Sequence, residues 1–130
     1  MLLTKECDYS VRIIRALRDG NKKTVKDISE LEHIPYQYAY KILKKLQKAG
    51  FLQNKRGPSG GYVLVKALDS FTIYDVVGAI DKNLFLNECL RDETQCPNNK
   101  NAQCTVHKEL IRLQDMLVLE MKNKTMEEIL

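Results

Sequence analysis

The chain has 130 residues, a formal net charge of +4, and 44% hydrophobic and 29% charged residues, which fits one globular domain and argues against two large independent ones. No stretch approaches the roughly 18 to 20 apolar residues that a membrane-spanning helix needs. Residues 1–6 lack the long apolar region and cleavage site of a signal peptide, so we expect a cytoplasmic protein. In that compartment cysteines are more often reactive or metal-bound than disulfide-paired.

The charge is divided unevenly along the chain. Residues 1–66 hold 14 Lys and Arg against 6 Asp and Glu, a net charge of +8, whereas residues 67–130 hold 7 against 11, a net charge of −4. A basic first half favours a polyanion such as nucleic acid as partner, and a solvated lysine-rich surface is the alternative interpretation.

Two helices are predicted before residue 34. The first runs over residues 5–18 and is ended by the turn residues 19–21. Thr24 opens the second, because Thr24 and Asp27 have the spacing of a capping box. The residues expected on the apolar faces are Tyr9, Ile13, Ala16 and Leu17 in the first helix and Val25, Ile28 and Leu31 in the second.

The third helix starts at Pro35, which suits a first helical turn, and ends before Gly50, which suits the position after a helix C-terminus. Its apolar residues recur at helical spacing and predict a buried stripe of Ala39, Ile42, Leu43 and Leu46. We expect Tyr38 to join the core. The opposite face is basic and carries Tyr36, Gln37, Tyr40, Lys41, Lys44, Lys45 and Lys48.

A hairpin follows, with strands at residues 51–55 and 62–65 joined by a turn rich in Gly and Pro. The order of three helices and a hairpin, with about three residues between the second and third helices, predicts a winged helix-turn-helix. A short fourth helix begins at Thr72, where Asp75 again gives the capping spacing.

The third helix and the hairpin supply candidate DNA contacts. In a helix-turn-helix the second helix of the motif enters the major groove with its N-terminal side chains on base edges, and Gln pairs well with adenine. Lysines along the flank of such a helix contact phosphates, and an Arg at a wing tip can enter a narrow minor groove. The predicted contacts are Tyr36, Gln37, Tyr40, Lys41, Lys44, Lys45, Arg56 and Ser59.

Residues 81–104 show no periodicity but carry Cys89, Cys96 and Cys104, and His107 follows one helical turn later. Thiolates and imidazole together suit zinc, copper(I) or an iron–sulfur cluster, and the wide spacing lacks the close cysteine pair of most structural zinc sites. From the residues alone, a cluster, a thiol redox switch and inert cysteines all remain open. An enzyme with Cys104 as nucleophile and His107 as base is disfavoured, because no orienting third group, oxyanion site or substrate pocket is indicated.

The last long helix is predicted over residues 105–122. Val106, Leu110, Leu113 and Leu117 have the spacing of a helix-pairing seam, so we favour a dimer over packing of this seam within one chain. The tail, residues 126–130, is too short to interpret. The predicted fold is mainly α with a small β-hairpin: a winged helix-turn-helix DNA-binding domain at 1–80, a cysteine-bearing sensor loop at 81–104, and a long C-terminal dimerisation helix and tail at 105–130.

The arrangement resembles the IscR/NsrR-type family of bacterial winged-helix transcription regulators over nearly the whole chain. The resemblance is carried by the cysteine triplet and by the following motifs: Met1-Leu2-Leu3-Thr4 with Asp8-Tyr9, Ile34-Pro35 before Tyr38 and Lys41-Ile42-Leu43, and Arg56-Gly57-Pro58-Ser59-Gly60-Gly61-Tyr62. It implies a homodimer that binds palindromic promoter DNA and reports iron–sulfur, nitric oxide or redox status through a cluster. The alternative is a DNA-binding regulator with a metal-free thiol switch.

The same resemblance implies the cluster ligands. Cys89, Cys96 and Cys104 match the three cysteine ligands, and His107 looks like the fourth ligand of a [2Fe–2S] cluster. Asp8 looks like the carboxylate that a partner subunit contributes to a [4Fe–4S] cluster. The intervals between the cysteines are slightly longer than the commonest ones in the family. We favour [2Fe–2S] with His107.

Overall fold

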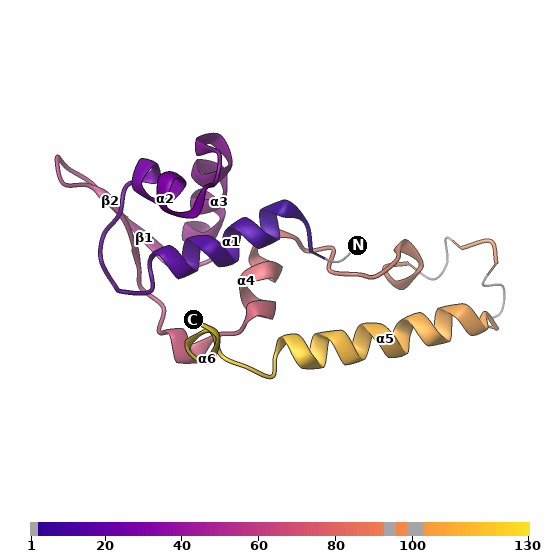
Figure 1. Ribbon diagram of the computed structural model, residues 1–130. Coiled ribbons are helices and arrows are strands. Elements are labelled where there is room, and N and C mark those ends of the chain that lie inside the picture. Colours follow the sequence, from indigo (N-terminus) through magenta and orange to yellow (C-terminus); the bar gives the residue numbers. More distant parts are fainter. Residues whose placement is uncertain (1–2, 93–95, 99–102) are drawn as a thin grey trace.

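The computed structural model describes residues 3–92, 96–98 and 103–130 (Figure 1). Residues 93–95 and 99–102 of the predicted sensor loop, and Met1-Leu2 of the N-terminal motif, lie outside the described residues. The elements are α1 (Lys5–Ala16), α2 (Val25–Glu32), α3 (Tyr36–Lys48), β1 (Leu52–Lys55), β2 (Gly61–Leu64), η1 (Leu68–Ser70), α4 (Ile73–Ile80), η2 (Glu88–Leu90), α5 (Thr105–Met121) and α6 (Met126–Ile129). The predicted fold, mainly helical with one antiparallel hairpin, is confirmed.

The helix boundaries follow from local capping chemistry. Thr24 and Thr72 each form a complete capping box with the Asp three residues later, as the sequence predicts. After α3, Gly50 adopts a positive φ of 86°, a conformation that glycine reaches without strain. The first helix ends at Ala16, two residues earlier than predicted.

Two side chains predicted to be apolar contacts are exposed instead. Leu31 is 56% exposed, and the buried neighbour on α2 is Glu32, whose carboxylate accepts a hydrogen bond of 3.1 Å from Nε of Arg15. Tyr38 is 46% exposed, so its predicted place in the core is wrong. It lies at the edge of the buried stripe of α3 and packs edge-on against the ring of Tyr9, with the centroids 5.9 Å apart.

The wing is fixed to the body of the domain. Strands β1 and β2 pair antiparallel, with Leu52 opposite Leu64, and the backbones of Tyr62 and Lys23 exchange hydrogen bonds of 2.8 and 3.0 Å. A Cβ at Gly61 would lie 2.6 Å from the carbonyl oxygen of Lys23, so only glycine allows this approach. The hydrogen bond from Lys23 lowers the pKa of Asp19 to about 2 and ties the same segment to the end of α1.

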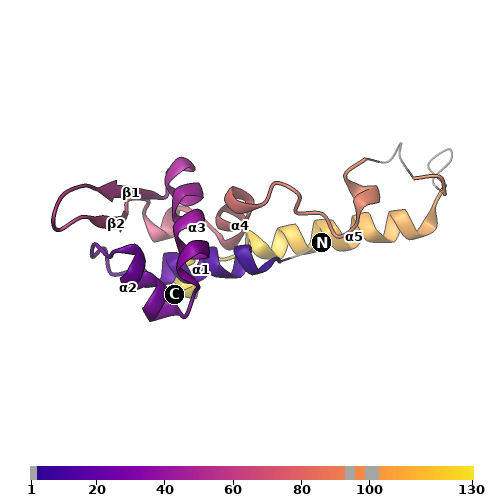
Figure 2. The same ribbon diagram turned by 90° about the horizontal axis from the view of Figure 1, so that it is seen from above.

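The long helix α5 extends along one side of the molecule, and the short α6 returns to the winged-helix core (Figure 1). Met126 of α6 is fully buried, and its N–H donates to the carbonyl of Phe71. Both views place the wing tip and the cysteine-bearing segment at opposite ends of the molecule (Figure 2). Within the described residues, no helix combines the length and the apolar character needed to cross a bilayer.

Candidate functional site

The predicted DNA contacts do not all line the same surface. Tyr36, Tyr40 and Lys44 of α3 and Arg56 of the wing line one groove of about 600 Å³ between the helix and the hairpin. Lys26 of α2 and Lys55 of β1 also line this groove, so its basic residues come from α2, α3 and the hairpin. Gln37 and Ser59 are exposed but do not line this groove. A basic groove between a helix and a wing suits a duplex backbone.

Two further predicted contacts on α3, Lys41 and Lys45, are engaged within the chain. Nζ of Lys41 donates to one carboxylate oxygen of Glu6 at 2.7 Å, and Nζ of Lys45 donates to the other at 2.8 Å. These hydrogen bonds lower the pKa of Glu6 and raise the pKa of Lys41. Lys44 instead lies over the ring of Tyr40, with Nζ 5.5 Å from its centroid. Glu6 has no motif around it, so sequence reasoning missed this contact.

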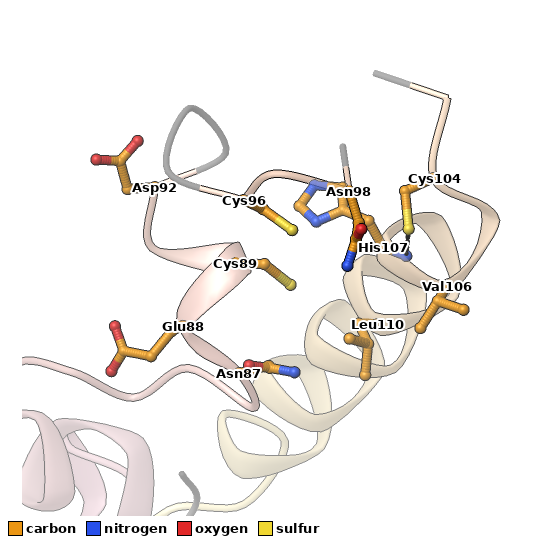
Figure 3. A pocket seen from close by; sticks show the side chains of 10 residues that line it. All are labelled: Asn87, Glu88, Cys89, Asp92, Cys96, Asn98, Cys104, Val106, His107 and Leu110. Atoms are coloured by element: carbon orange, nitrogen blue, oxygen red, sulfur yellow. Dashed lines mark hydrogen bonds between the residues drawn. The ribbon is translucent and has the colours of Figure 1, made fainter. Parts of the chain in front are cut away.

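At the other end of the molecule, the three loop cysteines and His107 line one cavity of about 650 Å³. Figure 3 shows the side chains of Cys89 and Cys96 pointing toward α5, whereas Glu88 and Asp92 point away from it. The apolar part of the wall comes from Val106 and Leu110 of α5, and the remaining lining residues are Asn87 and Asn98. Of the lining residues, only the cysteines and His107 were predicted to belong to this site; Val106 and Leu110 were predicted for the helix-pairing seam instead.

Secondary structure places three of the four predicted ligands. Cys104 is the N-cap of α5, and the backbone N–H of His107 donates to its Sγ at 3.4 Å. A hydrogen bond of this kind is stronger to a thiolate than to a thiol. His107 is the buried side chain of α5, and Cys89 sits in the middle of η2. Buried imidazole and backbone-capped sulfur are donors that a soft metal centre prefers.

The loop is attached to α5 upstream of the cavity as well. The side-chain amide of Gln114 accepts from the N–H of Leu86 at 2.8 Å and donates to the carbonyl of Leu84 at 2.6 Å. One polar residue on a long helix therefore fixes the segment that leads into η2. Gln114 lies between the seam leucines, and nothing in the sequence distinguishes it from a surface glutamine.

The four predicted ligands share a cavity but are not gathered into a coordination site. Among the described residues, no three Cys, His, Asp or Glu side chains lie close enough together to hold a metal ion. All four cysteines, which lie within the described part of the chain, are thiols rather than disulfides. Cys7 is buried in the core, and Asp8 is exposed on α1, paired with Arg12 at 2.8 Å.

Comparison with known families matches residues 3–130 to the Rrf2 model, described as an iron-dependent transcriptional regulator. The chain is 31% identical over 136 residues to the HTH-type transcriptional regulator IscR of Escherichia coli, which covers 99% of this chain and 80% of the relative. It is 34% identical over 97 residues to the regulator NsrR of Shouchella clausii, covering 72% of this chain and 65% of that relative.

Two solved structures show the same fold. CymR of B. subtilis, described as its global cysteine regulator, superposes with a TM-score of 0.75 at 20% identity, covering 99% of this chain and 95% of that one. IscR of T. potens superposes with a TM-score of 0.72 at 16% identity, covering 99% and 85%. At these identities the likeness establishes the winged-helix fold.

Proposed function

Because the chain belongs to the Rrf2 family of transcriptional regulators, we propose that it binds promoter DNA through α3 and the wing, and that an iron–sulfur cluster held by the loop cysteines regulates this binding. The family and the curated relatives are regulators and not enzymes, which confirms that part of the prediction. The observation that carries the proposal is the shared cavity of Cys89, Cys96, Cys104 and His107. We assign DNA binding to residues 1–80, sensing to 81–104 and subunit pairing to 105–130.

DNA binding is supported by the basic groove between α3 and the wing. Lys44 of α3 and Arg56 of the wing both line it, so both can reach phosphates of a duplex seated there. Tyr36, Gln37 and Tyr40 on the first turns of α3 are exposed and free to meet base edges in a major groove. We propose a double-stranded, palindromic operator, because two subunits related by a two-fold axis would present two copies of this surface.

Replacing Lys44 by Ala is expected to weaken binding to a short random-sequence duplex and to reduce the slope of log K against log salt by about 1, because one phosphate contact is lost. Fluorescence anisotropy titrations at several salt concentrations measure both quantities. Lys124→Ala, an exposed lysine that follows α5, is the matched control and should leave the slope unchanged. A wild-type protein that does not bind duplex DNA even at low salt contradicts the proposed function.

The residues present fit an iron–sulfur cluster in donor type. Three thiols and one buried imidazole face a single cavity, which is the donor set of a cluster with mixed cysteine and histidine ligation. When bound, the cluster supplies reversible one-electron chemistry and reactivity toward oxidants and nitric oxide. The chain's own part is to hold it: Cys104 from the N-cap of α5, His107 from the first turn, and Cys89 from η2.

The position of the fourth ligand favours [2Fe–2S] over [4Fe–4S]. His107 lines the same cavity as the cysteines, whereas Asp8 lines a different groove with Arg12 and Arg15. Asp8 would therefore have to reach the cluster of a partner subunit and exchange its ion pair with Arg12 for a metal bond.

The second candidate is a metal-free thiol switch, which the same cavity supports. A disulfide between two of the loop cysteines would form as a peroxide accepts two electrons and two protons and leaves as water. The staphylococcal CymR structure described as an oxidized form shares this fold with a TM-score of 0.74 at 19% identity. Thiol counting before and after peroxide treatment of metal-free protein tests this candidate, and an unchanged count contradicts it.

We also propose a homodimer paired through α5. The helix has 17 residues, all of them described by the structure, yet His107 is the only one whose side chain is buried. Val106 is 65% exposed and Leu119 is 68% exposed, and Leu113 and Met116 are also on the surface. A helix with so many accessible apolar side chains is stabilised by a second copy that covers them.

Replacing Leu113 by Glu is expected to convert the dimer into monomers at micromolar concentration, because a charge in the seam has to be desolvated on pairing. Sedimentation velocity measures the change in mass. Lys108→Glu also introduces a glutamate on α5, but away from the seam, and should stay dimeric. Wild-type protein that sediments as a monomer contradicts the dimer.

A further inference from the structure

Glu6 joins the start of α1 to the middle of α3 by two ion pairs. Its two carboxylate oxygens accept from Nζ of Lys41 and Nζ of Lys45, at 2.7 and 2.8 Å. The Glu6 side chain is largely buried by these contacts, and Nζ of Lys45 lies 3.4 Å from the carbonyl oxygen of Ile80. Both lysines are therefore held toward α1 and α4, away from the groove that Lys44 and Arg56 line.

This arrangement changes what α3 offers to a polyanion. Lys41, Lys44 and Lys45 would supply three positive charges, but the Glu6 carboxylate cancels one of them at contact distance. A phosphate that recruits Lys41 or Lys45 has to displace that carboxylate and leave it without its partner. Lys44 faces no carboxylate in the described contacts and is available at no such cost.

We propose that Glu6 is a specificity-determining residue that limits the non-specific part of DNA binding by holding Lys41 and Lys45. The inference rests on the proposed DNA-binding function and extends it to a residue outside α3 and the wing. Non-specific affinity comes almost entirely from phosphate contacts, whereas base contacts distinguish sequences. A residue that weakens two phosphate contacts while leaving Tyr36, Gln37 and Tyr40 unaffected reduces the sequence-independent part of the affinity, so base contacts supply a larger share of what remains.

A purely structural role for Glu6 makes the opposite prediction. If the two ion pairs serve only to dock α1 on α3, their loss lowers stability and leaves the salt dependence of DNA binding unchanged. The docking of these helices has other contacts, including the edge-on pair of Tyr9 and Tyr38 and the buried Ala39 and Ile42. The Glu6→Gln variant should therefore stay folded, because Gln has nearly the same shape and only the charge is removed.

The test is a titration of a short random-sequence duplex with wild type and Glu6→Gln over a range of salt concentrations. Release of the two lysines is expected to raise affinity at low salt by about threefold to tenfold. It should also steepen the slope of log K against log salt by about 0.9 for each further phosphate that the released lysines neutralise. Glu127→Gln, which removes the same charge from an exposed position on α6, controls for net charge.

A double-mutant cycle assigns the effect to the lysines. The double substitution Lys41→Gln and Lys45→Gln should lower affinity less in wild type than in Glu6→Gln, where it should abolish the increase. An unchanged slope in Glu6→Gln, an increase that survives loss of both lysines, or an equal increase in Glu127→Gln overturns the inference. Failure of the wild-type protein to bind the duplex at all overturns the proposed function instead, so the two failures are distinguishable.

Discussion

The Cys104→Ala variant is expected to contain neither iron nor sulfide after anaerobic reconstitution, whereas the wild type acquires both together with visible charge-transfer absorption. Cys104 combines two roles: it is a cavity-lining thiol and the N-cap of α5. Alanine removes the ligand and leaves the N–H of His107 without its sulfur acceptor. Metal analysis, sulfide analysis and absorption spectra measure the result.

The matched control is Cys7→Ala. Cys7 is buried in the core on α1 and does not line the cavity, so its loss should leave the iron content unchanged.

His107→Ala and Asp8→Ala then separate the two cluster types. Loss or an altered spectrum in the His107 variant alone supports [2Fe–2S], and the same change in the Asp8 variant alone contradicts it. Wild-type protein that stays colourless and iron-free rules out the cluster and leaves the thiol switch to be tested.

The largest effect on stability is expected at Met126. Its side chain is fully buried in the core formed by α1, α3, α4 and the wing, and Phe71 accepts a hydrogen bond from its backbone N–H. Met126→Ala removes buried apolar volume and leaves a cavity, which lowers the free energy of unfolding by about 2 to 5 kcal/mol. Urea unfolding followed by circular dichroism, at one fixed protein concentration, measures the loss.

Ile129→Ala tests whether this loss comes from burial rather than from helix propensity. Ile129 lies on the same short helix but is 44% exposed, so its truncation should cost less than about 1 kcal/mol. Similar losses in the two variants would show that α6 does not dock through Met126. The Thr125 capping box is present in both variants and cancels from the comparison.

The sequence predicted the winged-helix elements because their signals are local. The Thr24 and Thr72 capping boxes, Gly50 after α3 and the glycine-rich turn each depend on residues within one turn of the chain. The errors occurred where packing between distant segments decides. Leu31 fits the apolar spacing of α2, but the ion pair between Arg15 and Glu32 occupies the buried position beside it.

The helix α6 illustrates the same limit. It has four residues, too few for any periodicity, and a helix of that length is not stable alone. It forms because Met126 enters the core and Thr125 pairs with Thr72 through an isolated bridge. Thr72, and Phe71 whose carbonyl accepts from the N–H of Met126, lie about fifty positions upstream in the chain, where no local pattern indicates the contact.

For the candidate site, the sequence singled out the cysteines and His107 but not the contacts that hold the segments around them. Cysteine spacing and His107 indicated a soft metal centre, and all four side chains line one cavity. Glu6 and Gln114 carry no motif, because a single carboxylate or amide on a helix is indistinguishable by sequence from a solvent-exposed one. Their partners, Lys41 with Lys45 and the backbone of 84–86, become visible only in three dimensions.

The two hydrogen bonds of Gln114 have a mechanical consequence for regulation. They attach the segment before Cys89 to α5, and Cys104 is the N-cap of the same helix. Both ends of the cysteine-bearing loop are therefore attached to α5. A conformational change that is confined to this loop leaves the distant wing in place. To alter DNA binding, a change in the loop has to rotate or shift α5. The angle between the two α5 helices of the proposed dimer is therefore the quantity to compare with and without bound iron.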